Sequence, residues 1–294
     1  MSIQKKLFLA ATVLTLATLV AVIIVKPQPH FEEPLPSPNG YDDFLKAGSL
    51  ISGDAPYWQD VSIEELRPIV ATNQSILELV RAGLTKQCRV VPYSMPSGTN
   101  NHLNDLAAAK RIAHAFAAAG EIALLDGRTN EAASLALDCI RYGNELSRGG
   151  VIIDALVGIA VQSIGRARLH EALPGVDSAT SQRIVATLDD VLRSQESPRD
   201  VFKREAQWAQ KGRFGRVSFF QRLIQRFLTR KTLARAEQKF IKGGVDLQRT
   251  KLRAAVRAYE LDHGQPPAMA RDLVPHYLKS VPLDAATGQE MPLN

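Results

Sequence analysis

Residues 103–146 read LNDLAAAKRIAHAFAAAGEIALLDGRTNEAASLALDCIRYGNEL, and this stretch decides the fold class. Its first half is dense in alanine, whose small side chain permits close approach of two helices. Gly127 is a favoured helix stop, and Thr129 or Asn130 is a favoured start. The pattern predicts helices over 103–125 and from about 129 to 146. This pair is typical of a helical-repeat unit, although no second copy follows at the period of such repeats.

The helical pattern continues on both sides of this hairpin. Ser62 and Glu65 form a capping-box pattern that opens a helix, and glycine or proline separates most of the later segments. Further helices are predicted over 41–50, 62–85, 151–173, 178–193, from 198, over 217–242 and over 246–262. No strand pattern of useful length interrupts them. We therefore expect a mainly α fold, either an antiparallel helical bundle or a short helical-repeat array, with a small irregular C-terminal cap.

The N-terminal run Leu7–Val25 contains 19 residues and no charge. At about 1.5 Å per residue it is long enough to cross a hydrocarbon core of about 30 Å. Lys5 and Lys6 precede it, which favours a cytoplasmic N-terminus. The run predicts a single-pass transmembrane helix in a bacterial cytoplasmic (inner) membrane, with the bilayer as its partner. A cleaved signal peptide, whose apolar region spans about 7–15 residues, and a buried core helix are the alternatives.

The remaining chain is then extracytoplasmic and divides into three parts. Five prolines between residues 27 and 38 favour an extended spacer. The predicted organisation is a cytoplasmic stub (1–6), the transmembrane helix (7–25), a proline-rich linker with a short helix (26–60), a helical domain (61–258) and a C-terminal cap (259–294).

Positive charge is concentrated in residues 199–257. This segment has 17 Lys or Arg against four acidic residues, whereas the whole chain has a net charge of only +6. Around 217–228, apolar residues share one helix side, and the basic residues lie on the other side or flank the helix: Arg213, Arg216, Arg222, Arg226, Arg230 and Lys231. Such a helix can lie on an anionic lipid surface or bind an acidic envelope protein. It can also be an ordinary helix with solvated arginines. An extracytoplasmic location disfavours nucleic acid, although the charge would permit it.

The chain has two cysteines, Cys88 and Cys139. An oxidising compartment would allow a disulfide between them. Closing a loop of about 50 residues would contribute on the order of 4 kcal/mol. The alternative is two buried thiols that behave as small apolar side chains.

Motifs that carry a catalytic mechanism are absent from the sequence. It has no G-x-x-x-x-G-K-[ST], G-x-G-x-x-G, H-E-x-x-H or G-x-S-x-G pattern. The six histidines are scattered, and no two lie at i, i+4. Asp189 and Asp190 are adjacent on a predicted helix, so their side chains should diverge. The sequence therefore predicts no catalytic residue, no cofactor, no metal and no enzymatic activity.

The C-terminal 45 residues carry a recognisable pattern of aromatic, proline and glycine residues. Its members are Tyr259, Gly264, Pro267, Leu273, Tyr277, Leu278, Pro282, Asp284 and Gly288. This pattern resembles the C-terminal module of pseudopilin-like proteins of type II secretion systems. From about residue 61 onward the chain is also similar to uncharacterised membrane-anchored helical proteins of planctomycete-type bacteria. The prepilin glycine and the glutamate of true pseudopilins are missing at Lys6-Leu7 and within the apolar run, so filament assembly is not expected.

These patterns together favour a membrane-tethered, extracytoplasmic scaffold or adaptor whose helices present a protein-binding surface. The tail suggests an alternative, an accessory component of a type II secretion or pilus-like machine. A third reading is an envelope hydrolase with a site assembled from distant residues, which would have a deep polar pocket and a histidine or carboxylate of perturbed pKa.

Overall fold

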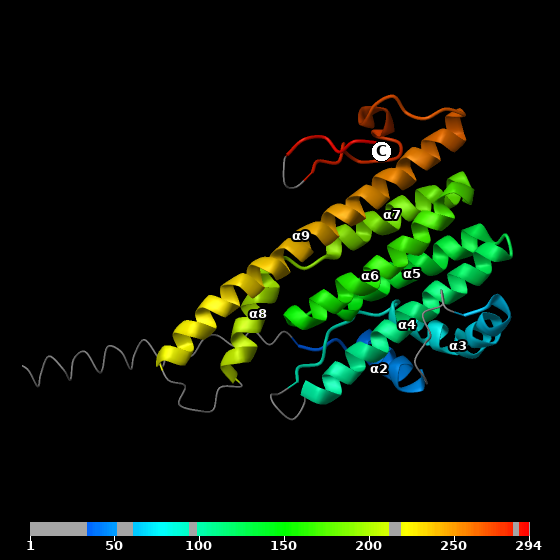
Figure 1. The fold of residues 1–294 in the computed structure, drawn as a ribbon. Helices are drawn as coiled ribbons and strands as arrows, with labels where there is room; N and C mark the ends of the chain where they lie inside the picture. Colours follow the sequence, from blue (N-terminus) through cyan, green and yellow to red (C-terminus); the bar gives the residue numbers. More distant parts are fainter. Residues whose placement is uncertain (1–33, 52–60, 94–98, 212–218, 285–287, 294) are drawn as a thin grey trace, which may run out of the picture. The chain divides into compact units, whose positions relative to one another are not determined.

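The computed structural model describes residues 34–51, 61–93, 99–211, 219–284 and 288–293, without the side chains of 99, 209–211 and 219–232. Eight α-helices pack as a bundle within these ranges (Figure 1). They are α2 (Gly40–Leu50), α3 (Ile63–Gly83), α4 (Thr99–Leu125), α5 (Thr129–Leu146), α6 (Ile152–Ala172), α7 (Ser178–Ser194), α8 (Pro198–Lys211) and α9 (Phe219–His263). The expected mainly α fold is confirmed, in its bundle form.

Local sequence signals place several helix ends. The Ser62 side chain accepts a hydrogen bond from the Glu65 backbone N–H, and the Glu65 carboxylate accepts from the Ser62 N–H. This capping box opens α3 as expected. Gly127, with φ at +74°, adopts the left-handed conformation that ends α4. The predicted hairpin of α4 and α5 therefore forms.

Helices α5 and α6 approach each other with their backbones nearly in contact. A Cβ added to Gly143 would lie 2.6 Å from the Gly158 carbonyl oxygen, and one added to Gly158 would lie 2.5 Å from that of Gly143. Gly165 lies one heptad further along α6 and is similarly close to the Ala136 carbonyl, at 2.8 Å. Glycine at these positions is what allows the two helices to pack so tightly.

Helix α9 differs from its prediction. The sequence pattern predicted two helices separated near Gly243-Gly244, but α9 runs without interruption from Phe219 to His263. The predicted break is therefore wrong. Glycine lowers helix propensity by about 1 kcal/mol relative to alanine without ending a helix, and tertiary contacts of α9 with α6 and α7 hold it in place (Figure 1).

The C-terminal tail folds back over the bundle. It contains a short 3-10 helix, η3 (Ala270–Leu273), and an isolated antiparallel bridge between Leu283 and Glu290. Asp189 of α7 accepts hydrogen bonds from Lys251 of α9 and Lys279 of the tail, at 3.1 and 2.9 Å. Apolar tail residues, among them Met291, are buried in the main core.

Both cysteines are buried free thiols. The Cys88 Sγ lies 3.5 Å from the Gly83 carbonyl oxygen, whereas the Cys139 Sγ lies 3.5 Å from that of Val161. The candidate disulfide is not formed in this structure, because each thiol packs against a different part of the backbone. Burial raises the pKa of Cys88 to about 12 and the pKa of Cys139 still further.

The structure leaves two of the sequence expectations unaddressed. The run Leu7–Val25 lies outside the described residues, and no helix within the described ranges has the length and apolarity to cross a membrane. Residues Arg213 and Arg216 also lie outside them, and the side chains of Arg222, Arg226, Arg230 and Lys231 are not described.

Candidate binding pocket

A pocket of about 370 Å³ lies where five helices and the C-terminal tail meet. Helices α5, α6, α8 and α9 contribute walls, together with the end of α7 and the residues after it. Its lining comprises Asn144, Ser147, Arg148, Ala155, Ile159, Gln162, Leu192, Ser194, Gln195, Glu196, Pro198, Val201, Phe240, Ile241, Gly243, Gly244, Val245, Gln248, Leu283 and Met291. The size is in the range of small-molecule sites, which are mostly apolar with a few polar groups.

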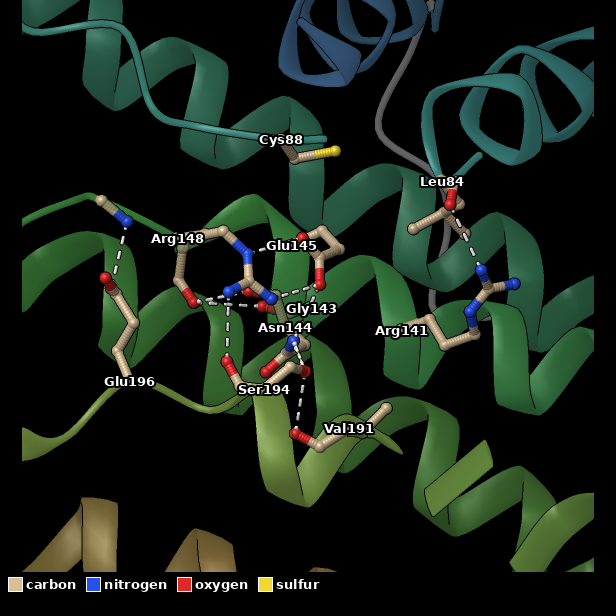
Figure 2. A network of polar contacts seen from close by, with 12 residues as sticks. Leu84, Cys88, Arg141, Gly143, Asn144, Glu145, Arg148, Val191, Ser194 and Glu196 are labelled. Carbon is tan, nitrogen blue, oxygen red and sulfur yellow. Dashed lines mark hydrogen bonds and ion pairs between the residues drawn. The ribbon is translucent and has the colours of Figure 1, made fainter. Parts of the chain in front are cut away.

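Arg148 follows α5 and lines the pocket, and Figure 2 shows its side chain held by a network of polar contacts. Its Nε and Nη2 donate to the two carboxylate oxygens of Glu145, at 2.7 and 2.6 Å, and its Nη1 donates to the Ser194 carbonyl at 3.2 Å. The bidentate bond to Glu145 raises the pKa of the Arg148 guanidinium above its usual value. The arginine is therefore charged and already paired.

Glu196, on the segment between α7 and α8, is the acidic group of the lining. Its carboxylate accepts a hydrogen bond from the Gly149 backbone N–H at 3.0 Å (Figure 2) and pairs with Arg204 of α8. Arg204 also donates to the Gly150 carbonyl at 2.9 Å. Glu196 thus ties the α5–α6 turn to α8, and its charge is neutralised by Arg204.

The uncharged polar groups of the pocket are mainly carboxamides. Asn144 donates to the Glu145 carboxylate and to the Ser194 hydroxyl, at 2.9 and 3.0 Å (Figure 2). Gln162 of α6 is only 5% exposed, yet its carboxamide makes no hydrogen bond within the described part of the chain. Gln195 and Gln248 are half-buried at the same pocket. The Gln162 amide atoms are not among the fully buried polar atoms that lack a partner, so they face the open space of the pocket.

A second buried polar group lies outside this pocket. The His102 Nε2 contacts the Asp154 Oδ1, and the Asp154 Oδ2 accepts from the Val151 N–H at 2.7 Å. The ring of Tyr93 stacks on His102 with centroids 3.9 Å apart, and Trp208 donates to the Tyr93 carbonyl. Because both oxygens of Asp154 are occupied, this group is a structural link between α4, α6 and α8.

The side chains singled out from the sequence do not meet at the pocket. Asp189 and Asp190 diverge as predicted, the first toward Lys251 and Lys279 and the second to solvent beside Arg193. Scattered histidines gave no sign of the pair between His102 and Asp154, because the two residues are 52 positions apart. The sequence signal for the pocket is the pair Gly243-Gly244, which interrupts a helical pattern and lines the pocket.

Neither known protein families, nor curated proteins, nor solved structures include a match to this chain. Within the described ranges, no group of three or more His, Cys, Asp or Glu side chains is placed to hold a metal ion. The pocket lining contains no histidine. The pocket has mostly apolar walls, two charged residues that are already paired, and glutamine carboxamides that are available for hydrogen bonds. These features suit the binding of a ligand.

Proposed function

We propose that the protein is a membrane-tethered, extracytoplasmic helical adaptor that holds a partner through the pocket beside α9. The observation that carries this proposal is the Gln162 carboxamide, which lines the pocket and has no partner within the described residues. A carboxamide both donates and accepts hydrogen bonds, so it can bind a partner in the pocket directly. A bound partner would form these hydrogen bonds in place of water.

The tether in this proposal is the apolar run Leu7–Val25, and the proline-rich segment that follows is the spacer. The expected orientation places the N-terminus in the cytoplasm and the helical domain outside it. The basic segment 199–257 would give a second contact, with an anionic lipid surface or an acidic envelope protein. Tethering raises the effective concentration of such a weak surface contact.

A second candidate function is an accessory role in a type II secretion or pilus-like machine. The resemblance of the tail suggests it, and the position of the tail gives it structural support. Leu283 and Met291 form part of the pocket wall. A partner in the pocket would therefore contact both the bundle and the segment that carries the resemblance.

Site-specific photocrosslinking in intact cells tests the adaptor proposal. A photoreactive residue replaces Ile241, which lines the pocket and is 47% exposed. The matched control replaces Leu261, which is on the same helix, is 39% exposed and does not line the pocket. We expect a discrete crosslinked product in the membrane fraction from position 241 only.

The identity of that product separates the two candidates. An envelope protein outside any secretion machine supports the adaptor role, and a secretion component supports the accessory role. Identical patterns from positions 241 and 261, or no product from position 241, would overturn the proposal that the pocket holds a partner.

A further inference from the structure

The glycine pair of α9 keeps space open in the pocket. Gly243 and Gly244 lie in the interior of a 45-residue helix, where each glycine costs about 1 kcal/mol relative to alanine. A Cβ on Gly243 would find its nearest neighbour, a side-chain carbon of Ile159, at 3.4 Å, and one on Gly244 would find the Gln195 Oε1 at 3.8 Å. Both are ordinary van der Waals distances. Packing therefore does not require glycine here, and the pair widens the pocket that it lines.

The pocket has no net charge to offer a ligand. Arg148 and Glu196 are its only charged lining residues among those described. Arg148 is bonded to Glu145, and Glu196 is paired with Arg204. A charged ligand would have to be desolvated without gaining an opposite charge, and this is strongly unfavourable in an apolar chamber. The pocket therefore favours an uncharged ligand.

The glutamine carboxamides of the lining indicate which kind of uncharged ligand fits the pocket. A carboxamide has both an acceptor oxygen and a donor NH₂ group, so it complements another amide. Gln162, Gln195 and Gln248 supply such groups around aliphatic and aromatic walls. A sugar would leave many hydroxyls against apolar walls, and a free fatty acid would bring a carboxylate. An amide beside an apolar side chain matches both parts of the lining.

We infer that the pocket binds an uncharged peptide-like ligand, with one apolar side chain among Ile159, Phe240 and Val245 and an adjacent amide hydrogen-bonded to Gln162. This inference rests on the proposed binding function and names the chemistry of its ligand. The ligand is either a free peptide or an exposed segment of a partner protein, and both present the same groups.

The first experiment compares three probes with the full-length chain in lipid nanodiscs. N-acetyl-L-leucinamide is neutral, N-acetyl-L-leucine carries a carboxylate and L-leucinamide carries an ammonium group. Binding is measured by isothermal titration calorimetry and by ligand-observed NMR. We expect the neutral probe to bind at least about tenfold more tightly than either charged probe, because neither charge finds a partner. Equal or tighter binding of a charged probe would overturn the inference.

Two variants of pocket residues then test whether the neutral probe binds in this pocket. Gln162→Leu keeps the bulk of the side chain but removes the amide, and Gly244→Leu fills the space left by the glycine. We expect Gln162→Leu to weaken the neutral probe about tenfold and Gly244→Leu to abolish its binding. Gln74→Leu, an exposed glutamine of α3 outside the pocket, is the control. Circular dichroism confirms that each variant is folded.

Failure of this inference can be told apart from failure of the proposed function. A crosslinked product at position 241 without binding of the neutral probe would keep the adaptor and overturn the peptide-like ligand. Unchanged probe binding in folded Gln162→Leu and Gly244→Leu would overturn the placement in this pocket. If the probe binds as expected and the crosslink is seen, the source is a partner protein. If the probe binds and position 241 gives no product, the source is a free peptide.

Discussion

Two glycine pairs in this bundle serve opposite purposes. At the α5–α6 crossing, a Cβ on Gly143 or Gly158 would lie 2.5 to 2.6 Å from a backbone oxygen. In α9, a Cβ on Gly243 or Gly244 would meet nothing closer than 3.4 Å. The first pair lacks side chains because another helix occupies the space. The second pair lacks them although the space is open.

This difference distinguishes glycines that helix packing requires from glycines that mark a candidate binding site. A glycine that touches the backbone of another helix is explained by the fold alone. A glycine in a helix interior with room beside it weakens the helix without an evident packing gain. Departures from local consistency are expected at functional sites, and the α9 pair lies on the wall of the described pocket.

The largest expected effect is at the tight crossing. Gly158→Ala would bring a Cβ to 2.5 Å from the Gly143 oxygen and 2.8 Å from the Ser147 Oγ, so α5 and α6 would have to separate. We expect a loss of about 2 kcal/mol in the free energy of unfolding, measured by chemical denaturation of the full chain followed by circular dichroism.

Gly120→Ala is the matched control for that substitution. Gly120 is also helical and buried, but its added Cβ would meet its nearest neighbour, a side-chain carbon of Arg168, at 3.7 Å. We expect this variant to be more stable than the wild type by about 0.5–1 kcal/mol. Equal effects of the two substitutions would contradict the distinction between filled and open glycine sites.

The second test concerns the open pair. Gly244→Ala should raise the free energy of unfolding by about 0.5–1 kcal/mol, because alanine is the better helix former and its Cβ lies 3.8 Å from the nearest atom. The same denaturation assay measures it. A destabilised Gly244→Ala protein would mean that packing does require glycine at this position, and the functional reading of the pair would lose its main support.

The sequence predicts the helices better than it predicts the pocket. Capping residues such as Ser62 and stops such as Gly127 act locally, so α3 and the α4–α5 hairpin could be placed from the chain alone. The sequence predicted separate helices over 217–242 and 246–262, because the effect of glycine on helix propensity is local whereas the contacts that hold α9 in one helix are not. Gln162 lies on a helix that the sequence predicts, but its place on the pocket wall is seen only once α5, α7 and α9 are placed beside α6.

An effect no larger than that of Gly244→Ala is expected at Asp189, which bonds to Lys279 of the tail. The bonds from Lys279 and then Lys251 lower the pKa of the Asp189 carboxyl below its usual range. A lowered pKa in the folded state means that the carboxylate stabilises the fold above the unfolded-state pKa of about 3.9 and that this contribution is lost as the pH falls below it. Asp189→Asn should therefore reduce stability by roughly 0.5–1 kcal/mol at pH 7, and the difference from the wild type should vanish at strongly acid pH.

Asp190→Asn is the control for this last test, because Asp190 is the next residue on α7 and its side chain is 70% exposed. We expect it to leave the unfolding free energy unchanged at any pH. Since Leu283 and Met291 of the tail line the pocket, loosening the tail should also weaken the neutral probe in the Asp189→Asn protein. A pH-independent difference between Asp189→Asn and the wild type would show that geometry rather than charge holds the tail, and unchanged probe binding would show that the tail wall does not contribute to recognition.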